Sequence, residues 1–70
     1  MNDWPEEVGV SCKLYDNAEI ERGIEVATER LSQWAMSQGA VLLYRRIFVT
    51  RPANYCPGNL GVSYFVWRPT

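Results

Sequence analysis

The chain has 70 residues, of which 47% are hydrophobic and 21% charged, and it contains no histidine. These proportions are typical of a globular protein, and the length allows one domain with one core. No apolar run reaches the roughly 20 residues that span a bilayer, so we expect a single domain over residues 1–70 and no membrane partner.

The net charge of −1 conceals an uneven distribution along the chain. All eight acidic residues lie in residues 1–30 with only three basic residues, which gives that segment a net charge of −5. Residues 31–70 carry four arginines and no acidic residue, a net charge of +4. The two segments can each suit a partner of opposite charge, or they can attract each other.

The N-terminal segment, residues 1–7, is predicted to be a polar arm anchored by Trp4. It carries acidic residues where a signal peptide carries basic ones, so we expect a cytoplasmic location. The following residues, 8–15, alternate between apolar and polar or small side chains, which predicts a half-buried strand.

The next segment has the spacing of an amphipathic helix, predicted from about Asn17 to Gln38. Asp16 is the expected N-cap, Glu19 completes a capping-box pattern, and Gly39 is the expected left-handed stop. Gly23 marks either a close approach to the sheet or nothing. The apolar stripe consists of Ile20, Ile24, Ala27, Leu31 and Trp34 or Ala35.

The outer face of this helix carries Glu21, Glu25 and Glu29, four residues apart, which we call the acidic ridge. Like charges at this spacing repel each other slightly, so the ridge does not serve helix stability. It is either a solvated surface or a contact for a basic partner.

Residues 40–52 are rich in β-branched and aromatic side chains and predict a second strand ended by Pro52. Alternation places Arg45 on the aliphatic side. Either a bulge at Arg45–Arg46 turns both side chains outward, or Arg45 lies near the helix end and reaches past it. Pro57–Gly58 fits a type II turn, and a third strand is expected from about Leu60 to Arg68.

The predicted fold is therefore α+β, with the order β-α-β-β and one helix packed on one face of a three-stranded sheet. The helix is long enough to return the chain so that the second strand runs parallel to the first. The third strand should run antiparallel to the second.

The sheet face without a helix is the predicted contact surface. Exposed aromatic residues next to cations are typical of interaction sites. By alternation this face carries five of the nine aromatic residues of the chain. Its members are Lys13, Tyr15, Tyr44, Arg46, Phe48, Phe65 and Trp67.

Three partners could cover this face: the arm with Trp4, a second copy of the chain in a homodimer, or a foreign macromolecule. A protein or ribonucleoprotein complex is favoured over nucleic acid alone, because a pI near 5.2 does not suit strong phosphate binding. The alternative is a single-stranded nucleic-acid-binding module that stacks bases on the aromatic side chains.

We expect no enzymatic activity, no metal site and no cofactor. Without histidine, a serine or cysteine nucleophile lacks its usual base, and two cysteines cannot supply four zinc ligands. In the cytosol we expect Cys12 to be a small core residue and Cys56 a free loop thiol.

Taken whole, the chain resembles the very small inhibitor proteins of phages and mobile elements, anti-CRISPR proteins among them. The resemblance rests on size, the acidic helix, and the aromatic and arginine-rich "LLYRRIFV" and "YFVWRP". It implies a non-enzymatic protein in the host cytoplasm that inhibits or modulates a larger protein or ribonucleoprotein complex by occupying its surface. Such proteins share no catalytic residues, so no role transfers to a particular position.

Overall fold

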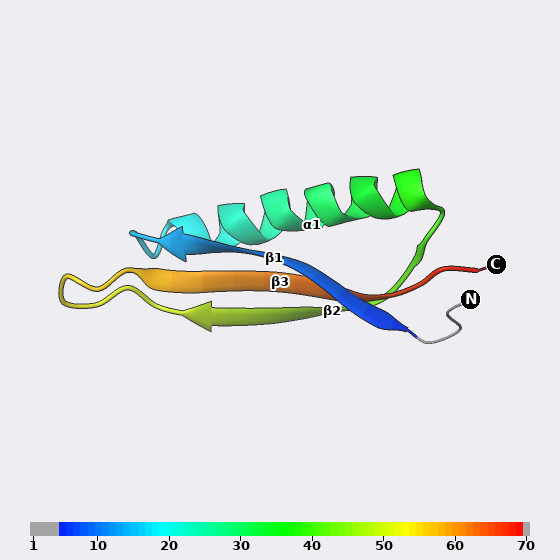
Figure 1. Ribbon diagram of the computed structural model, residues 1–70. Helices are drawn as coiled ribbons and strands as arrows, with labels where there is room; N and C mark the ends of the chain where they lie inside the picture. The colour runs from blue at the N-terminus through cyan, green and yellow to red at the C-terminus, as the bar shows by residue number, and fades with distance from the viewer. Residues whose placement is uncertain (1–4, 70) are drawn as a thin grey trace.

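The computed structural model describes residues 5–69, which form one helix packed on one face of a three-stranded sheet (Figure 1). The elements follow in the order β1 (Glu6–Leu14), α1 (Glu19–Gln38), β2 (Val41–Thr50) and β3 (Gly58–Trp67). The predicted α+β fold with the order β-α-β-β is confirmed. The arm contact predicted for Trp4 lies outside the described residues.

The third strand lies in the centre of the sheet, whose order is β1-β3-β2. Both outer strands are antiparallel to β3, so β1 and β2 run in the same direction, as predicted, without being neighbours. As the central strand, β3 has neighbours on both sides and contributes apolar side chains to the middle of the core. Its Leu60, Val62 and Val66 are almost completely buried.

The core lies between α1 and the sheet. The helix contributes Ala27, Leu31 and Ala35 from the predicted apolar stripe, and Leu14 joins them from the end of β1. The helix also approaches the sheet closely at Gly23, where an added Cβ atom would lie 2.5 Å from Leu60 Cδ2. Gly23 therefore marks a close approach, one of the two possibilities that the sequence allowed.

The two ends of α1 differ in how well they were predicted. The helix begins at Glu19, and its N-cap position is Ala18, not Asp16. Asp16 instead closes the preceding turn, where its Oδ1 accepts a hydrogen bond from the backbone N–H of Ala18 at 3.0 Å. The helix ends as expected, with Gly39 in the left-handed conformation at φ 65°.

Two strand boundaries were wrong. β1 begins at Glu6, so the arm is shorter than residues 1–7, and β3 begins at Gly58 instead of Leu60. The chain reverses at Asn54 and Tyr55, both with positive φ, and Ala53 and Cys56 exchange backbone hydrogen bonds on either side. This two-residue turn matches the twist of a hairpin better than a type II turn at Pro57–Gly58 would.

The alternation of β2 changes at Leu43, where the register with β3 shifts between Leu42 and Tyr44. The predicted bulge at Arg45–Arg46 is therefore misplaced by about two residues. Arg45 remains on the helix side and reaches α1, where its Nη1 donates a hydrogen bond to Thr28 Oγ1 at 3.0 Å. The second possibility, that Arg45 lies near the helix end and reaches past it, is also wrong, because Thr28 lies in the middle of α1.

Cys12 was predicted to be a core residue and is exposed, because β1 is an edge strand. Cys56 is an exposed loop thiol, as predicted. Within residues 5–69, α1 is not apolar enough to cross a membrane.

Candidate functional site: the open sheet face

The sheet face opposite α1 carries aromatic side chains on β2 and β3 and small or polar side chains on β1. The pairing register sets these residues in rows across the sheet, with Phe65 between Glu7 and Tyr44, and Gly61 between Ser11 and Phe48. Trp67 follows Phe65 by two residues and lies on the same face. We call Tyr44, Phe48, Phe65 and Trp67 the aromatic patch.

The aromatic patch is partly ordered by its own contacts and largely accessible. The rings of Tyr44 and Phe65 stack with centroids 4.7 Å apart and an angle of 16° between their planes. Tyr44 is 56% exposed, Phe48 65% and Trp67 40%. Large aromatic side chains at such exposure form a ready-made apolar surface that a partner could cover.

A polar stripe crosses the sheet through the aromatic patch, between Phe48 and the other three aromatic side chains, and links all three strands. The carboxylate of Glu7 on β1 accepts a hydrogen bond from Ser63 Oγ on β3 at 2.7 Å. The same carboxylate oxygen lies 3.8 Å from Arg46 Nη1 on β2. The guanidinium of Arg46 thus has a carboxylate beside it on the open face.

Glu7 was not among the predicted site residues, since it was assigned to the arm. The signal was present in the sequence, because the alternation of Gly9, Ser11 and Lys13 extends backwards by two residues to Glu7. It was hidden by the two consecutive acidic residues, Glu6 and Glu7, which are unusual at the start of a strand.

Two residues predicted for this face are not part of the aromatic patch. Lys13 is on the face, but at its far end, opposite Asn59. Tyr15 lies beyond the end of β1 and is 73% exposed. Its backbone N–H donates to Glu19 Oε1 at 3.1 Å, so it belongs to the turn before α1.

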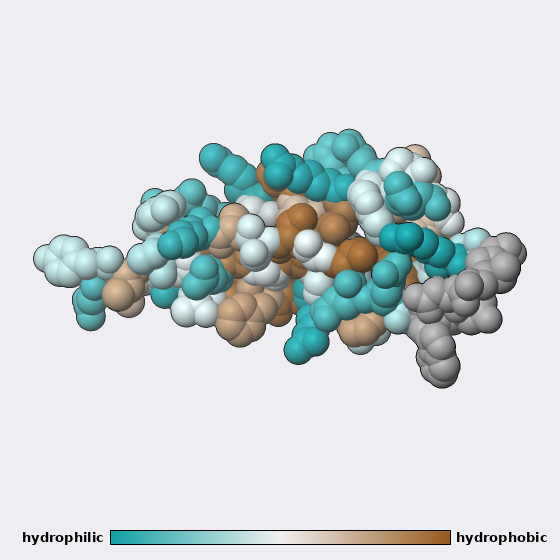
Figure 2. Space-filling model, viewed as in Figure 1, coloured by the Kyte–Doolittle hydropathy of each residue, from teal (hydrophilic) through white to brown (hydrophobic). Residues whose placement is uncertain are grey.

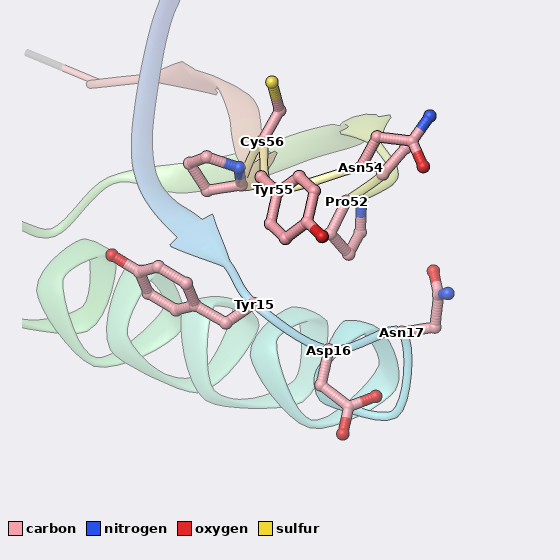
Figure 3. Close-up of a pocket in the computed structure, with 9 residues that line it drawn as sticks. Tyr15, Asp16, Asn17, Pro52, Asn54, Tyr55 and Cys56 are labelled. Carbon is pink, nitrogen blue, oxygen red and sulfur yellow. The ribbon is translucent and has the colours of Figure 1, made fainter.

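Tyr15 instead lines a hollow between that turn and the loop of residues 52–57 (Figure 3). The carboxylate of Asp16 points away from the loop in Figure 3 and is engaged with the backbone of Ala18. The loop is held to the turn by Arg51, whose Nη1 donates to Asn17 Oδ1 at 3.2 Å. The side chains of Asp16 and Arg51 thus both make hydrogen bonds within the turn and the loop.

The acidic ridge is exposed along α1. Within residues 5–69 its one side-chain hydrogen bond is from Gln33 Nε2 to Glu29 Oε1 at 3.4 Å. Because α1 covers one face of the sheet and the aromatic patch occupies the other, the two predicted surfaces lie on opposite sides of the molecule. The structure does not bring them together.

Residues 5–69 contain no group of three or more acidic or cysteine side chains placed to hold a metal ion. The absence of an enzymatic, metal or cofactor site stays a prediction. What the geometry does provide is an accessible aromatic surface on a rigid sheet.

No protein-family model matches the chain, and no curated protein and no solved structure is significantly similar to it.

Proposed function

We propose that this protein is a non-enzymatic interaction protein that binds a protein or ribonucleoprotein complex through the aromatic patch. Covering that partner's surface would inhibit or modulate it. The single observation that carries the proposal is the exposure of three aromatic side chains, Tyr44, Phe48 and Trp67, on a face that no helix covers. Cellular location and the resemblance to anti-CRISPR proteins remain predictions from the sequence.

The composition of the face supports a protein surface as the partner. Tyrosine, tryptophan and arginine are the side chains that most often dominate binding energy at protein interfaces. The patch lies on paired strands, so its backbone is already ordered before a partner binds. The polar stripe of Glu7, Ser63 and Arg46 adds hydrogen-bonding groups between the aromatic side chains, and protein interfaces also combine apolar contacts with hydrogen bonds.

One observation favours single-stranded nucleic acid as the alternative partner. The stacked pair Tyr44 and Phe65 offers a flat aromatic surface next to Arg46, which suits base stacking with a phosphate contact. Against it, Glu7 places a negative charge beside Arg46. A phosphate approaching Arg46 would meet that carboxylate, which weakens the electrostatic attraction.

The test is capture of partners from lysate by the immobilised protein, with the Trp67→Ala variant in parallel. Truncating a buried anchor costs about 2 kcal/mol or more, which is a roughly thirtyfold loss of affinity. Tyr55→Ala is the matched control, because Tyr55 is a fully exposed aromatic residue in the loop, outside the aromatic patch. We expect Trp67→Ala to lose capture and Tyr55→Ala to keep it.

Two results would decide against the proposal or in favour of its alternative. If Trp67→Ala and Tyr55→Ala captured the partner equally well, the aromatic patch would not be the binding surface. Loss of capture after nuclease treatment, when the captured species is nucleic acid alone, would favour the single-strand alternative. Unfolding of the Trp67→Ala variant, seen by circular dichroism, would require Tyr44→Ala as the replacement, since Tyr44 is 56% exposed.

A further inference from the structure

β1 is an edge strand with an uncovered apolar side. Two adjoining hollows run between β1 and α1, and both are lined by Val10 and Arg30. Val10 is 38% exposed, and the buried Val62 lies at the base of one hollow. Figure 2 looks onto this side, where β1 crosses in front of the other strands, and shows apolar side chains gathered below α1 with hydrophilic ones around them.

The two edges of the sheet are protected differently. An edge strand can pair with another chain unless charges or bulges prevent it. β2 has both defences, since its register shifts at Leu43 and its centre carries Arg45 and Arg46. If β2 paired with its own copy over most of its length, one of these arginines would stand opposite itself, and like charges in that position destabilise the pair. β1 has no bulge in its nine paired residues, and its charged side chains, Glu6, Glu7 and Lys13, lie near its two ends, so its centre carries no charge.

We propose that β1 pairs antiparallel with β1 of a second copy, with Val10 on the two-fold axis. The strand spans Glu6–Leu14, so Val10 is its midpoint, and this register pairs every residue of the strand. On the helix side Val10 then meets itself and Val8 meets Cys12 of the second copy. At the two ends Glu6, which is paired with Arg68 of its own chain, meets Leu14. On the open face Lys13 meets Glu7, whose Oε2 already accepts from Ser63 and lies beside Arg46, so Lys13 adds a second cation to this carboxylate on each side of the axis.

The register is self-complementary in both size and charge. Between the two Glu7–Lys13 pairs lie only Gly9 and Ser11, which leave room for the two backbones to approach. A shift by one residue in either direction shortens the pairing and separates Glu7 from Lys13. The two-fold axis is perpendicular to the sheet, because antiparallel partners on one face stay on that face.

The dimer would cover the uncovered apolar side without using the aromatic patch. The hollows of both copies would meet at the two-fold axis. The exposed Arg30 can keep its aliphatic carbons over the hollows while its guanidinium turns toward solvent. The sheet grows to six strands, with both helices on one face and both aromatic patches on the other. This inference does not rest on the proposed function, since it concerns another surface.

The test compares the mass of two lysine variants in solution by light scattering. Val10 and Ile47 flank Val62 from opposite sides of β3 and are 38% and 39% exposed, so they are matched positions on the two edges. We expect the wild type and Ile47→Lys to have about twice the chain mass of 8.1 kDa. Val10→Lys should have the mass of one chain, because it sets two ammonium groups face to face.

A monomeric wild type, a Val10→Lys variant that stays dimeric, or growth into open filaments would each overturn the proposal. Circular dichroism shows whether Val10→Lys is folded. If the Val10→Lys variant is unfolded, cysteine cross-linking tests the dimer instead. In a background with Cys12→Ala and Cys56→Ala, Val10→Cys should form an intermolecular disulfide on mild oxidation, because antiparallel partners lie at disulfide distance.

Val8→Cys is the control for this cross-link. In the proposed register the two copies of residue 8 are four residues apart along the strands, roughly 13 Å, which no disulfide spans. Cross-linking at position 10 and not at position 8 supports the register. Equal cross-linking at both positions, or none at position 10, contradicts it.

Discussion

At the scale of single residues, Gly23 shows how the core constrains the helix. A Cβ atom at this position would lie 2.5 Å from Leu60 Cδ2, and Leu60 is only 2% exposed. Alanine would improve helix propensity by about 1 kcal/mol, but overpacking a core costs typically 1–3 kcal/mol. We expect Gly23→Ala to lower the free energy of unfolding by about 1 kcal/mol, measured by urea denaturation.

Glu25→Ala is the control, since it places alanine at an exposed position of α1. Its effect should stay within about 0.5 kcal/mol. A Gly23→Ala variant that is more stable than the wild type would show that Leu60 can move aside and that the close approach is loose.

How far single residues could be predicted depended on whether their conformation is local. Gly39 was predicted correctly, because a helix end followed by glycine is a local signal. Asn54 and Tyr55 were missed, since a tyrosine with positive φ is unusual and Pro57–Gly58 offered a stronger turn signal nearby. The role of Gly23 could not be decided from the sequence, because it depends on a contact with Leu60, which is far away along the chain.

At the scale of elements, the packing of α1 on the sheet depends on few side chains. Leu31 is 5% exposed and belongs to the core cluster, which also includes Leu60 and Val62 of β3. Truncating a buried leucine costs about 2–5 kcal/mol, which is a large part of the stability of so small a domain. We expect Leu31→Ala to be largely unfolded or to melt far below the wild type in a thermal scan followed by circular dichroism.

Met36→Ala on the same helix serves for comparison, since Met36 is 81% exposed and its truncation should leave the melting temperature nearly unchanged. If both variants melted together with the wild type, the apolar stripe would not be what attaches α1 to the sheet.

The existence and direction of the elements could be predicted, but the position of β3 could not. Periods of two and of 3.6 residues are visible in the sequence and fix which residues share a face. Which strands become neighbours depends on backbone pairing between distant segments. The central place of β3 also made β1 an edge strand and thereby exposed Cys12.

At the scale of the whole molecule, the unequal charges of the two halves of the chain are partly paired with each other. Glu7 lies beside Arg46, and Glu6 Oε1 lies 3.1 Å from Arg68 Nε. Arg68 also lies over the ring of Trp34 at 5.1 Å, so the chain after β3 is attached to α1. The possibility that the halves attract each other is therefore realised at the sheet, and the acidic ridge is left outside it.

We propose that the acidic ridge is a second contact for a basic partner, on the side of the molecule opposite to the aromatic patch. Glu21→Gln, Glu25→Gln and Glu29→Gln together remove three exposed charges without changing shape, so folding should be unaffected. Capture of a partner should weaken, and the difference from the wild type should shrink as salt is added, because exposed charges are screened. Since the two surfaces lie on opposite sides, the effects of this triple change and of Trp67→Ala on affinity should add. If the triple variant captured the partner as well as the wild type at low salt, the acidic ridge would be a solvated helix face and not a contact surface.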